Sequence, residues 1–259
     1  MVRIATAMIM LMAMAGVAEA KLHTETLEYK HGDVVLEGYL AYDDTITGKR
    51  PGVLIVHEWK GLGSYEKSRA EQLAKIGYVA FALDMYGKGI RPKTNEEASA
   101  QATNFYKDIP LMRARANAGL QAMRLQPHVD TTRIAAIGYC FGGKTVLELA
   151  RSGAEIAGVV SFHGGLSTPN PDDAKNIRCK VLVCHGGADP HVPPDQVNAF
   201  EDEMTNAKVD WQLDVYGGAV RSFTNPESGN DASSGAAYSE SADKRSWQAM
   251  RLFFNEIFK

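Results

Sequence analysis

The stretch that most constrains the fold of this 259-residue chain is Gly138–Gly143, which reads GYCFGG. It follows an apolar run over Arg133–Ile137 and precedes a helical pattern over Lys144–Ala150. A short, continuous apolar run is typical of a buried strand. We therefore predict a strand, a sharp turn and a helix in succession, with Cys140 on the turn.

This succession is the setting of the nucleophile elbow, G-x-S-x-G, in which a strained turn holds a reactive side chain. Glycines flank such a turn because the neighbouring backbones leave no room for a Cβ. A thiolate at Cys140 would lie at a helix N-terminus, where the helix dipole favours negative charge and lowers the thiol pKa. The alternative is a buried core cysteine beside an ordinary glycine-rich turn.

Residues 1–20 differ from the rest of the chain. Arg3 supplies a positive charge, residues 4–17 are almost entirely apolar or small, and Ala18–Ala20 fits the A-x-A cleavage pattern. We predict a signal peptide that is removed after Ala20, which leaves a periplasmic or secreted protein without a membrane anchor. An uncleaved anchor is the alternative, although the apolar run is short for a membrane span.

We expect residues 21–259 to form a single domain, because this length suits one α/β domain. The net charge of −3 gives no basic surface for a nucleic acid. Cys179 and Cys184 flank a predicted strand that is too long for one disulfide to span. We expect a monomer that acts on a small molecule.

Predicted strands and helices alternate along the chain. A hairpin over 25–30 and 34–42 comes first, and strands follow over 53–56, 79–83, 133–137, 158–162, 181–184 and 211–216. Helices are predicted over 64–76, over 95–125 with a second helix starting at Pro110, over 144–150, over 193–206 and over 242–258. This alternation predicts an α/β fold with a mostly parallel, doubly wound sheet covered by helices on both faces. Polar residues gather after the strands' carboxyl ends, where ligands bind in such sheets.

Four separated places in the chain resemble the dienelactone hydrolase family, a branch of the α/β-hydrolase fold. They are GYCFGG around Cys140, Glu58 after the strand at 53–56, Asp189 in GGADP, and YGGAVRSFTNP near the C-terminus. The resemblance runs from about residue 24 to the C-terminus. It implies hydrolysis of the enol-lactone ring of a dienelactone, or of other small esters or lactones, by a Cys-His-Asp triad without a cofactor or metal.

The resemblance assigns roles to individual residues. Cys140 would be the nucleophile that forms a thioester, Asp189 the acid of the triad, and Glu58 the carboxylate that helps to deprotonate the thiol. The backbone N–H groups of Phe141 and Trp59 would form the oxyanion hole, and the residue after the nucleophile is a usual donor there.

Substrate contacts are also implied by the resemblance. Lys88 takes the place of an arginine that binds the substrate's carboxylate, so an anionic substrate is implied. A second such arginine is replaced by Asn225. Tyr86, Trp59 and Phe141 are expected to form apolar walls of the pocket, since ligand pockets are mostly apolar and aromatic.

The chain departs from the family at the catalytic histidine. Arg221 stands before Ser-Phe where the family has histidine, and no histidine follows His191. A guanidinium has only donors and a pKa above 12, so it cannot accept a proton. We expect Cys140 to be acylated with Glu58 as base and deacylation to be slow, which gives weak hydrolysis or an accumulated acyl-enzyme.

Other histidines follow predicted strands. His191, two residues past Asp189, is the best substitute base. His57, His163 and His185 are interpreted as structural residues that hydrogen-bond loop backbone rather than as metal ligands, because their spacing matches no metal motif. Asp84 is interpreted as the cap of the turn that follows its strand.

Two other functions stay open at this stage. Arg221 favours a non-catalytic protein that holds a ligand on the same scaffold, whereas Cys140, Glu58 and Asp189 favour an enzyme, and fold alone does not separate the two. A redox-sensing thiol at Cys140 would need a resolving cysteine nearby.

Overall fold

We describe a computed structural model in which residues 21–259 are placed, so the predicted signal peptide lies outside the described residues. Eight strands form one sheet in the order β1-β2-β4-β3-β5-β6-β7-β8. The strands are β1 (Leu22–His31), β2 (Val34–Asp43), β3 (Arg50–Val56), β4 (Val79–Leu83), β5 (Val129–Tyr139), β6 (Gly158–Phe162), β7 (Lys180–Gly186) and β8 (Trp211–Tyr216). The α-helices are α1 (Ser64–Lys75), α2 (Asn95–Lys107), α3 (Ile109–Arg124), α4 (Phe141–Arg151), α5 (Pro194–Asn206) and α6 (Glu240–Ile257). Short 3₁₀ helices η1 (Pro171–Asn176), η2 (Pro226–Ser228) and η3 (Ala232–Ser234) complete the elements.

Strand direction follows the predicted pattern. β1 and β2 form an antiparallel hairpin, and β2 runs antiparallel to β4. Every other neighbouring pair is parallel, from β4 through β3, β5, β6 and β7 to β8. The chain leaves β3 toward β4 on one side and returns to place β5 on the other. The carboxyl ends of β3 and β5 therefore form a topological switch point, where open α/β sheets bind ligands.

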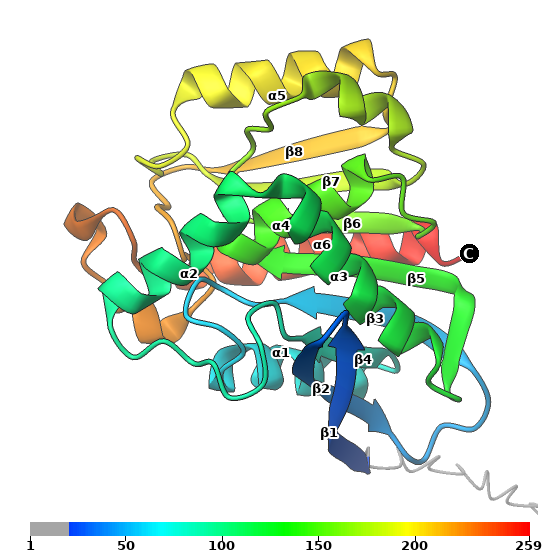
Figure 1. Ribbon diagram of the computed structural model, residues 1–259. Coiled ribbons are helices and arrows are strands. Elements are labelled where there is room, and N and C mark those ends of the chain that lie inside the picture. The colour runs from blue at the N-terminus through cyan, green and yellow to red at the C-terminus, as the bar shows by residue number, and fades with distance from the viewer. Residues whose placement is uncertain (1–20) are drawn as a thin grey trace, which may run out of the picture.

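Helices cover both faces of this sheet, as the alternating pattern predicts (Figure 1). On one face, α1 and α6 pack side chains such as Leu73 and Phe254 against alternate strand residues. On the other face, α2, α3, α4 and α5 do so, with Met112, Leu147 and Phe200 in the core. Central strands are apolar on both sides because both of their faces are buried.

The elbow has the predicted strand, turn and helix. β5 ends at Tyr139, α4 begins at Phe141, and Cys140 between them has a φ of +53°. Positive φ is unfavourable for a residue with a Cβ, so the packing around Cys140 must hold this conformation. A Cβ at Gly142 would lie 2.1 Å from the carbonyl oxygen of Val56. Glycine there lets α4 approach the end of β3.

The division of the helical stretch at 95–125 and the state of two cysteines agree with the sequence predictions. The helical stretch at 95–125 is divided at Asp108, whose carboxylate accepts a hydrogen bond from Leu111 N–H at 2.9 Å, and Pro110 lies in the first turn of α3 as expected. Cys179 and Cys184 are buried and unbridged.

Within residues 21–259, no helix has the length and apolar character needed to cross a membrane.

Candidate active site

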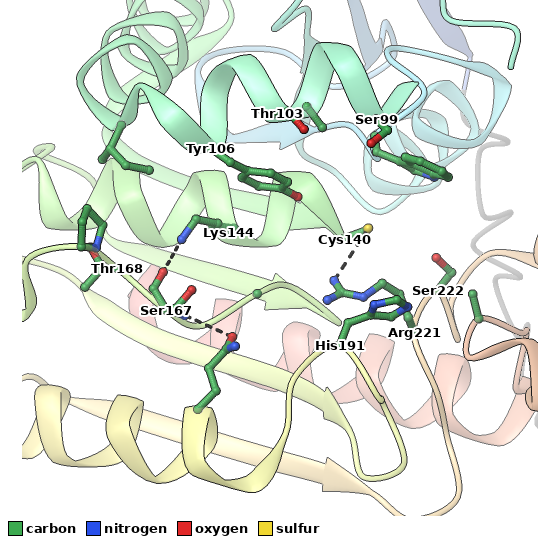
Figure 2. Close-up of a pocket in the computed structure, with 17 residues that line it drawn as sticks. Ser99, Thr103, Tyr106, Cys140, Lys144, Ser167, Thr168, His191, Arg221 and Ser222 are labelled. Carbon is green, nitrogen blue, oxygen red and sulfur yellow. Dashed lines mark hydrogen bonds between the residues drawn. The ribbon is translucent and has the colours of Figure 1, made fainter. Parts of the chain in front are cut away.

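A cavity of about 730 Å³ opens at the carboxyl ends of β3 and β5. Its walls come from separate parts of the chain: Trp59 after β3, Tyr106 on α2, Cys140 at the elbow, Lys144 on α4 and Arg221 after β8. Figure 2 shows Cys140 and Arg221 directed toward one another across this cavity.

Cys140 is 8% exposed and lies at the cavity wall. Burial raises the pKa of its thiol above the ordinary value. The guanidinium of Arg221 and the N–H of Phe141 act in the opposite direction, because both stabilise a thiolate, whereas the nearby Glu58 carboxylate disfavours it. At neutral pH the protonated thiol therefore predominates, and a base is needed to generate the nucleophile.

Arg221 lies between the two outer members of the predicted triad. Its Nη1 donates to Cys140 Sγ at 3.8 Å and to the carbonyl oxygen of His163 at 2.7 Å. Its Nε lies 3.4 Å from Asp189 Oδ2, an ion pair between side chains that are 14% and 0% exposed. The guanidinium thus fills the position at which a triad would have its imidazole.

Glu58 is held by the loop that follows β8. Its carboxylate accepts hydrogen bonds from Ser222 Oγ at 3.0 Å and from Asn225 Nδ2 at 2.7 Å. Burial raises the pKa of Glu58, and these two donors oppose that rise. The negative charge of Glu58 contributes to the raised pKa of Cys140, but the side-chain hydrogen bonds that Glu58 accepts come from Ser222 and Asn225.

Tyr86 supports the backbone of Trp59. The Tyr86 hydroxyl donates to the carbonyl oxygen of Trp59 at 2.8 Å, and its ring packs 4.8 Å from His57 and 5.6 Å from Phe141, centre to centre. The Trp59 indole lines the cavity, whereas Tyr86 is not among the lining residues. Tyr86 thus lies behind the cavity wall, where it fixes the peptide next to the predicted oxyanion donor.

Comparison with known proteins identifies the family. The profile of the Dienelactone hydrolase family matches residues 36–258. The chain belongs to the dienelactone hydrolase family. This membership confirms the resemblance seen in the sequence and the α/β-hydrolase fold.

Individual relatives span nearly the whole chain. A putative carboxymethylenebutenolidase of Yersinia pestis is 25% identical over 241 residues, which cover 90% of this chain and 87% of the relative. The solved structure of m3DLH is 41% identical with a TM-score of 0.89, covering 92% of this chain and 99% of that one. A dienelactone hydrolase-like promiscuous phosphotriesterase, P91 from metagenomic libraries, is 41% identical with a TM-score of 0.87, covering 91% and 98%.

Lys88 is not brought to the cavity. It is 46% exposed and forms ion pairs with Glu28 on β1 and Glu37 on β2. Its backbone N–H donates to the carbonyl oxygen of Val35 at 2.9 Å, which ties the turn after β4 to the hairpin. The structure therefore places the predicted carboxylate ligand at the edge of the sheet, away from the residues that line the cavity.

Lys144 and Tyr106 are among the polar residues of the cavity that the sequence did not reveal. Lys144 donates to the carbonyl oxygen of Ser167 and lies 3.9 Å from Glu148, and burial lowers its pKa. Tyr106 lies along the wall, and burial together with the nearby Cys140 raises the pKa of its hydroxyl. Lys144 could have been found from its place one turn after Cys140 on the predicted helix, whereas nothing in the local sequence marks Tyr106.

The prediction that the strand-end histidines hydrogen-bond loop backbone is confirmed for His57 and His163. His57 Nε2 accepts from Met85 N–H and His163 Nδ1 accepts from Cys140 N–H, both at 3.1 Å. Burial lowers the pKa of His57 to about 4 and that of His163 well below its usual range, so both rings stay neutral. His185 is buried without a partner for Nδ1. Within residues 21–259, no three His, Cys, Asp or Glu residues gather as metal ligands would.

Asp84 caps a turn beside the site, and His191 lines the cavity. The Asp84 carboxylate accepts from Tyr86 N–H at 3.0 Å and from Gly87 N–H at 3.2 Å, which confirms its role as a turn cap. His191 is exposed at the cavity, and its backbone N–H donates to Asp189 Oδ1 at 2.9 Å.

Proposed function

We propose that this protein cleaves small esters or lactones by forming a thioester on Cys140, and that loss of the acyl group to water is its slow step. The observation that carries this proposal is the position of Arg221 between Cys140 and Asp189. The relatives named carboxymethylenebutenolidase support a lactone as the substrate class.

Acylation can proceed with the groups present. Glu58 takes the thiol proton, and burial makes its carboxylate a stronger base than an ordinary glutamate. The thiolate attacks the carbonyl carbon, while the N–H groups of Phe141 and Trp59 stabilise the oxyanion. The oxyanion then reforms the carbonyl, the acyl C–O bond breaks, and its electron pair leaves with the oxygen of the leaving group. Enolates and phenolates leave without taking up a proton, so esters and lactones with such leaving groups should react fastest.

Deacylation lacks its usual base. The attacking water must lose a proton, and Arg221 has no acceptor atom to receive it. General base catalysis typically contributes about 10²–10⁴-fold to a rate. The thioester on Cys140 should therefore accumulate during turnover.

The cavity favours an anionic acyl group. Arg221 and Lys144 both line it, and both carry cations that can face a carboxylate. These two residues would take the role that the family resemblance implies for Lys88, which forms ion pairs at the surface. Lys144 would act as a point charge. Arg221 would contribute its remaining Nη2 donors, because Nη1 and Nε are engaged by Cys140, His163 and Asp189.

A rapid-mixing experiment with p-nitrophenyl acetate tests the proposal. Release of p-nitrophenolate should show a burst of about one equivalent per protein, followed by a slow steady state, as is typical of an accumulating acyl-enzyme. Cys140→Ser should abolish the burst, and Arg221→His should retain it while accelerating the slow phase. Absence of a burst with esters and lactones would instead favour a ligand-binding protein on this scaffold.

A further inference from the structure

We propose that the acyl group on Cys140 is passed to a small thiol that carries a carboxylate, so that the protein acts as a thiol-dependent acyltransferase. This inference rests on the proposed function, because it requires the acyl-enzyme. It goes further by naming the acceptor of the acyl group.

The polar groups near the thioester are unsuited to activating water. Arg221 Nη1 and the Phe141 N–H, which face the sulfur, are donors only. The Tyr106 hydroxyl stays protonated, because burial and the nearby thiol raise its pKa. Glu58 holds the proton that it took from the thiol during acylation, and its carboxyl group is hydrogen-bonded to Ser222 and Asn225. These four groups therefore give the attacking water no base, and His191, which also lines the cavity, is tested by substitution below.

A thiolate acceptor does not need that base. Its sulfur attacks the thioester carbon and forms a new C–S bond, the bond to Cys140 Sγ breaks, and the electron pair leaves with Cys140 as a thiolate. No proton is transferred and nothing is oxidised or reduced, because one thioester is exchanged for another. The Arg221 cation at 3.8 Å stabilises the departing Cys140 thiolate, and a stabilised leaving thiolate speeds such exchange.

The cavity has room and charge for this acceptor. Its volume of about 730 Å³ lies within the range of small-molecule sites, so an acetyl group on Cys140 leaves space for a second small molecule. Lys144 is 8% exposed and directs its ammonium to the carbonyl oxygen of Ser167 on the cavity wall. A carboxylate on the thiol can bind this ammonium while Arg221 attracts the thiolate. Ser99 and Thr103 add hydroxyl groups to the opposite wall.

The test uses acetyl-enzyme isolated by gel filtration after reaction with p-nitrophenyl acetate. It is mixed with 3-mercaptopropionate, 2-mercaptoethanol or cysteamine, and loss of the acetyl group is followed by intact-protein mass spectrometry. The reference is the reaction of the same thiols with S-acetyl-N-acetylcysteine, compared at equal thiolate concentration.

We expect 3-mercaptopropionate to deacylate the enzyme at least about tenfold faster than the reference thioester, since a cationic cleft raises the local concentration of anions by about 10–10³-fold. The order should be 3-mercaptopropionate, then 2-mercaptoethanol, then cysteamine, with the acetylated thiol as product. Lys144→Met should lower the preference for the carboxylate thiol over 2-mercaptoethanol. Lys144→Arg should keep it.

Three results would overturn the inference. One is a normal burst with thiol rates equal to those of the reference. Another is an order of thiols that does not depend on charge. The third is rapid loss of the acetyl group in water that His191→Ala slows, because His191 would then be the base for hydrolysis. Absence of the burst itself would instead refute the proposed function, so the two failures are distinguishable.

Discussion

The Nη1 atom of Arg221 lies 3.8 Å from the sulfur of Cys140. The same guanidinium is 3.4 Å from Asp189, so it bridges the proposed nucleophile and the proposed acid of the triad. A permanent cation in this place can stabilise a thiolate but cannot accept a proton. In the proposed mechanism, an imidazole in this place would activate both the thiol and the attacking water. Arg221 retains part of the first function, because its cation stabilises the Cys140 thiolate, and loses the second.

The reactivity of Cys140 should depend on pH through this pair. Because burial holds the thiol pKa above its ordinary value, the rate of alkylation by iodoacetamide should keep rising as pH increases beyond about 8.5. Arg221→Met removes a cation that favours the thiolate, so it should raise the pKa and shift the profile to higher pH. Peptide mass spectrometry would assign the alkylated residue. An Arg221→Met variant that reacts faster than the parent at neutral pH would contradict this account.

Tyr86 should act as a positioning residue for the oxyanion hole. Tyr86→Phe removes the 2.8 Å hydrogen bond to the Trp59 carbonyl oxygen, and a bond of this kind contributes about 1 kcal/mol. If that energy orients Trp59 N–H in the transition state, the burst rate should fall about fivefold. The burst amplitude should stay near one equivalent. A lower amplitude with an unchanged rate would indicate a loss of folded protein instead.

Gly142 should be essential for the elbow. In Gly142→Ala the new Cβ would lie 2.1 Å from the Val56 carbonyl oxygen, so α4 or β3 must shift. We expect a loss of about 1–3 kcal/mol or more in the free energy of unfolding, measured by urea denaturation. Gly217→Ala is the matched control, because its Cβ would meet nothing within 4 Å. Equal stability of the two variants would argue against the close approach of these elements.

The free energy of unfolding should also depend on a buried ion network that joins Arg151 and Glu148 on α4 to Glu203 on α5. Arg151 is fully buried and contacts Glu148 at 3.0 Å and Glu203 at 2.8 Å. Arg151→Met leaves Glu203 without its arginine partner, and breaking a buried pair costs about 3–5 kcal/mol. Adding Glu203→Leu should recover part of that loss, since Glu148 keeps Arg113 at 2.7 Å. A double variant less stable than Arg151→Met would contradict this reading.

Much of the fold follows from local sequence pattern. The apolar run at 53–56 and the one at 133–137 predict buried strands because both faces of a central parallel strand are covered. The elbow at Cys140 can be predicted because its strand, glycines and helix follow one another within a few residues of sequence. The contact of Gly142 with Val56 on the distant strand β3 becomes visible only in the structure.

The parts of the site that local sequence does not reveal depend on contacts between distant segments. Lys88 follows a strand end, yet a backbone bond to Val35 turns it toward the acidic residues of the hairpin. Tyr106 reaches the cavity because α2 packs its Phe105 and Tyr106 rings against Phe141, the first residue of α4. Glu58 is within the site as the resemblance implies, but its partners Ser222 and Asn225 lie over 160 residues further along the chain.

The most direct test of the central claim is the lifetime of the acyl group on Cys140. The protein, Cys140→Ser and Arg221→His would each be mixed with p-nitrophenyl acetate in thiol-free buffer, and intact mass would be recorded over time. We predict a persistent single acetyl adduct on the parent protein, none on Cys140→Ser, and a short-lived one on Arg221→His, whose deacylation should be about 10²–10⁴-fold faster. An adduct that decays equally fast in the parent and in Arg221→His, or no adduct at all, would contradict the account.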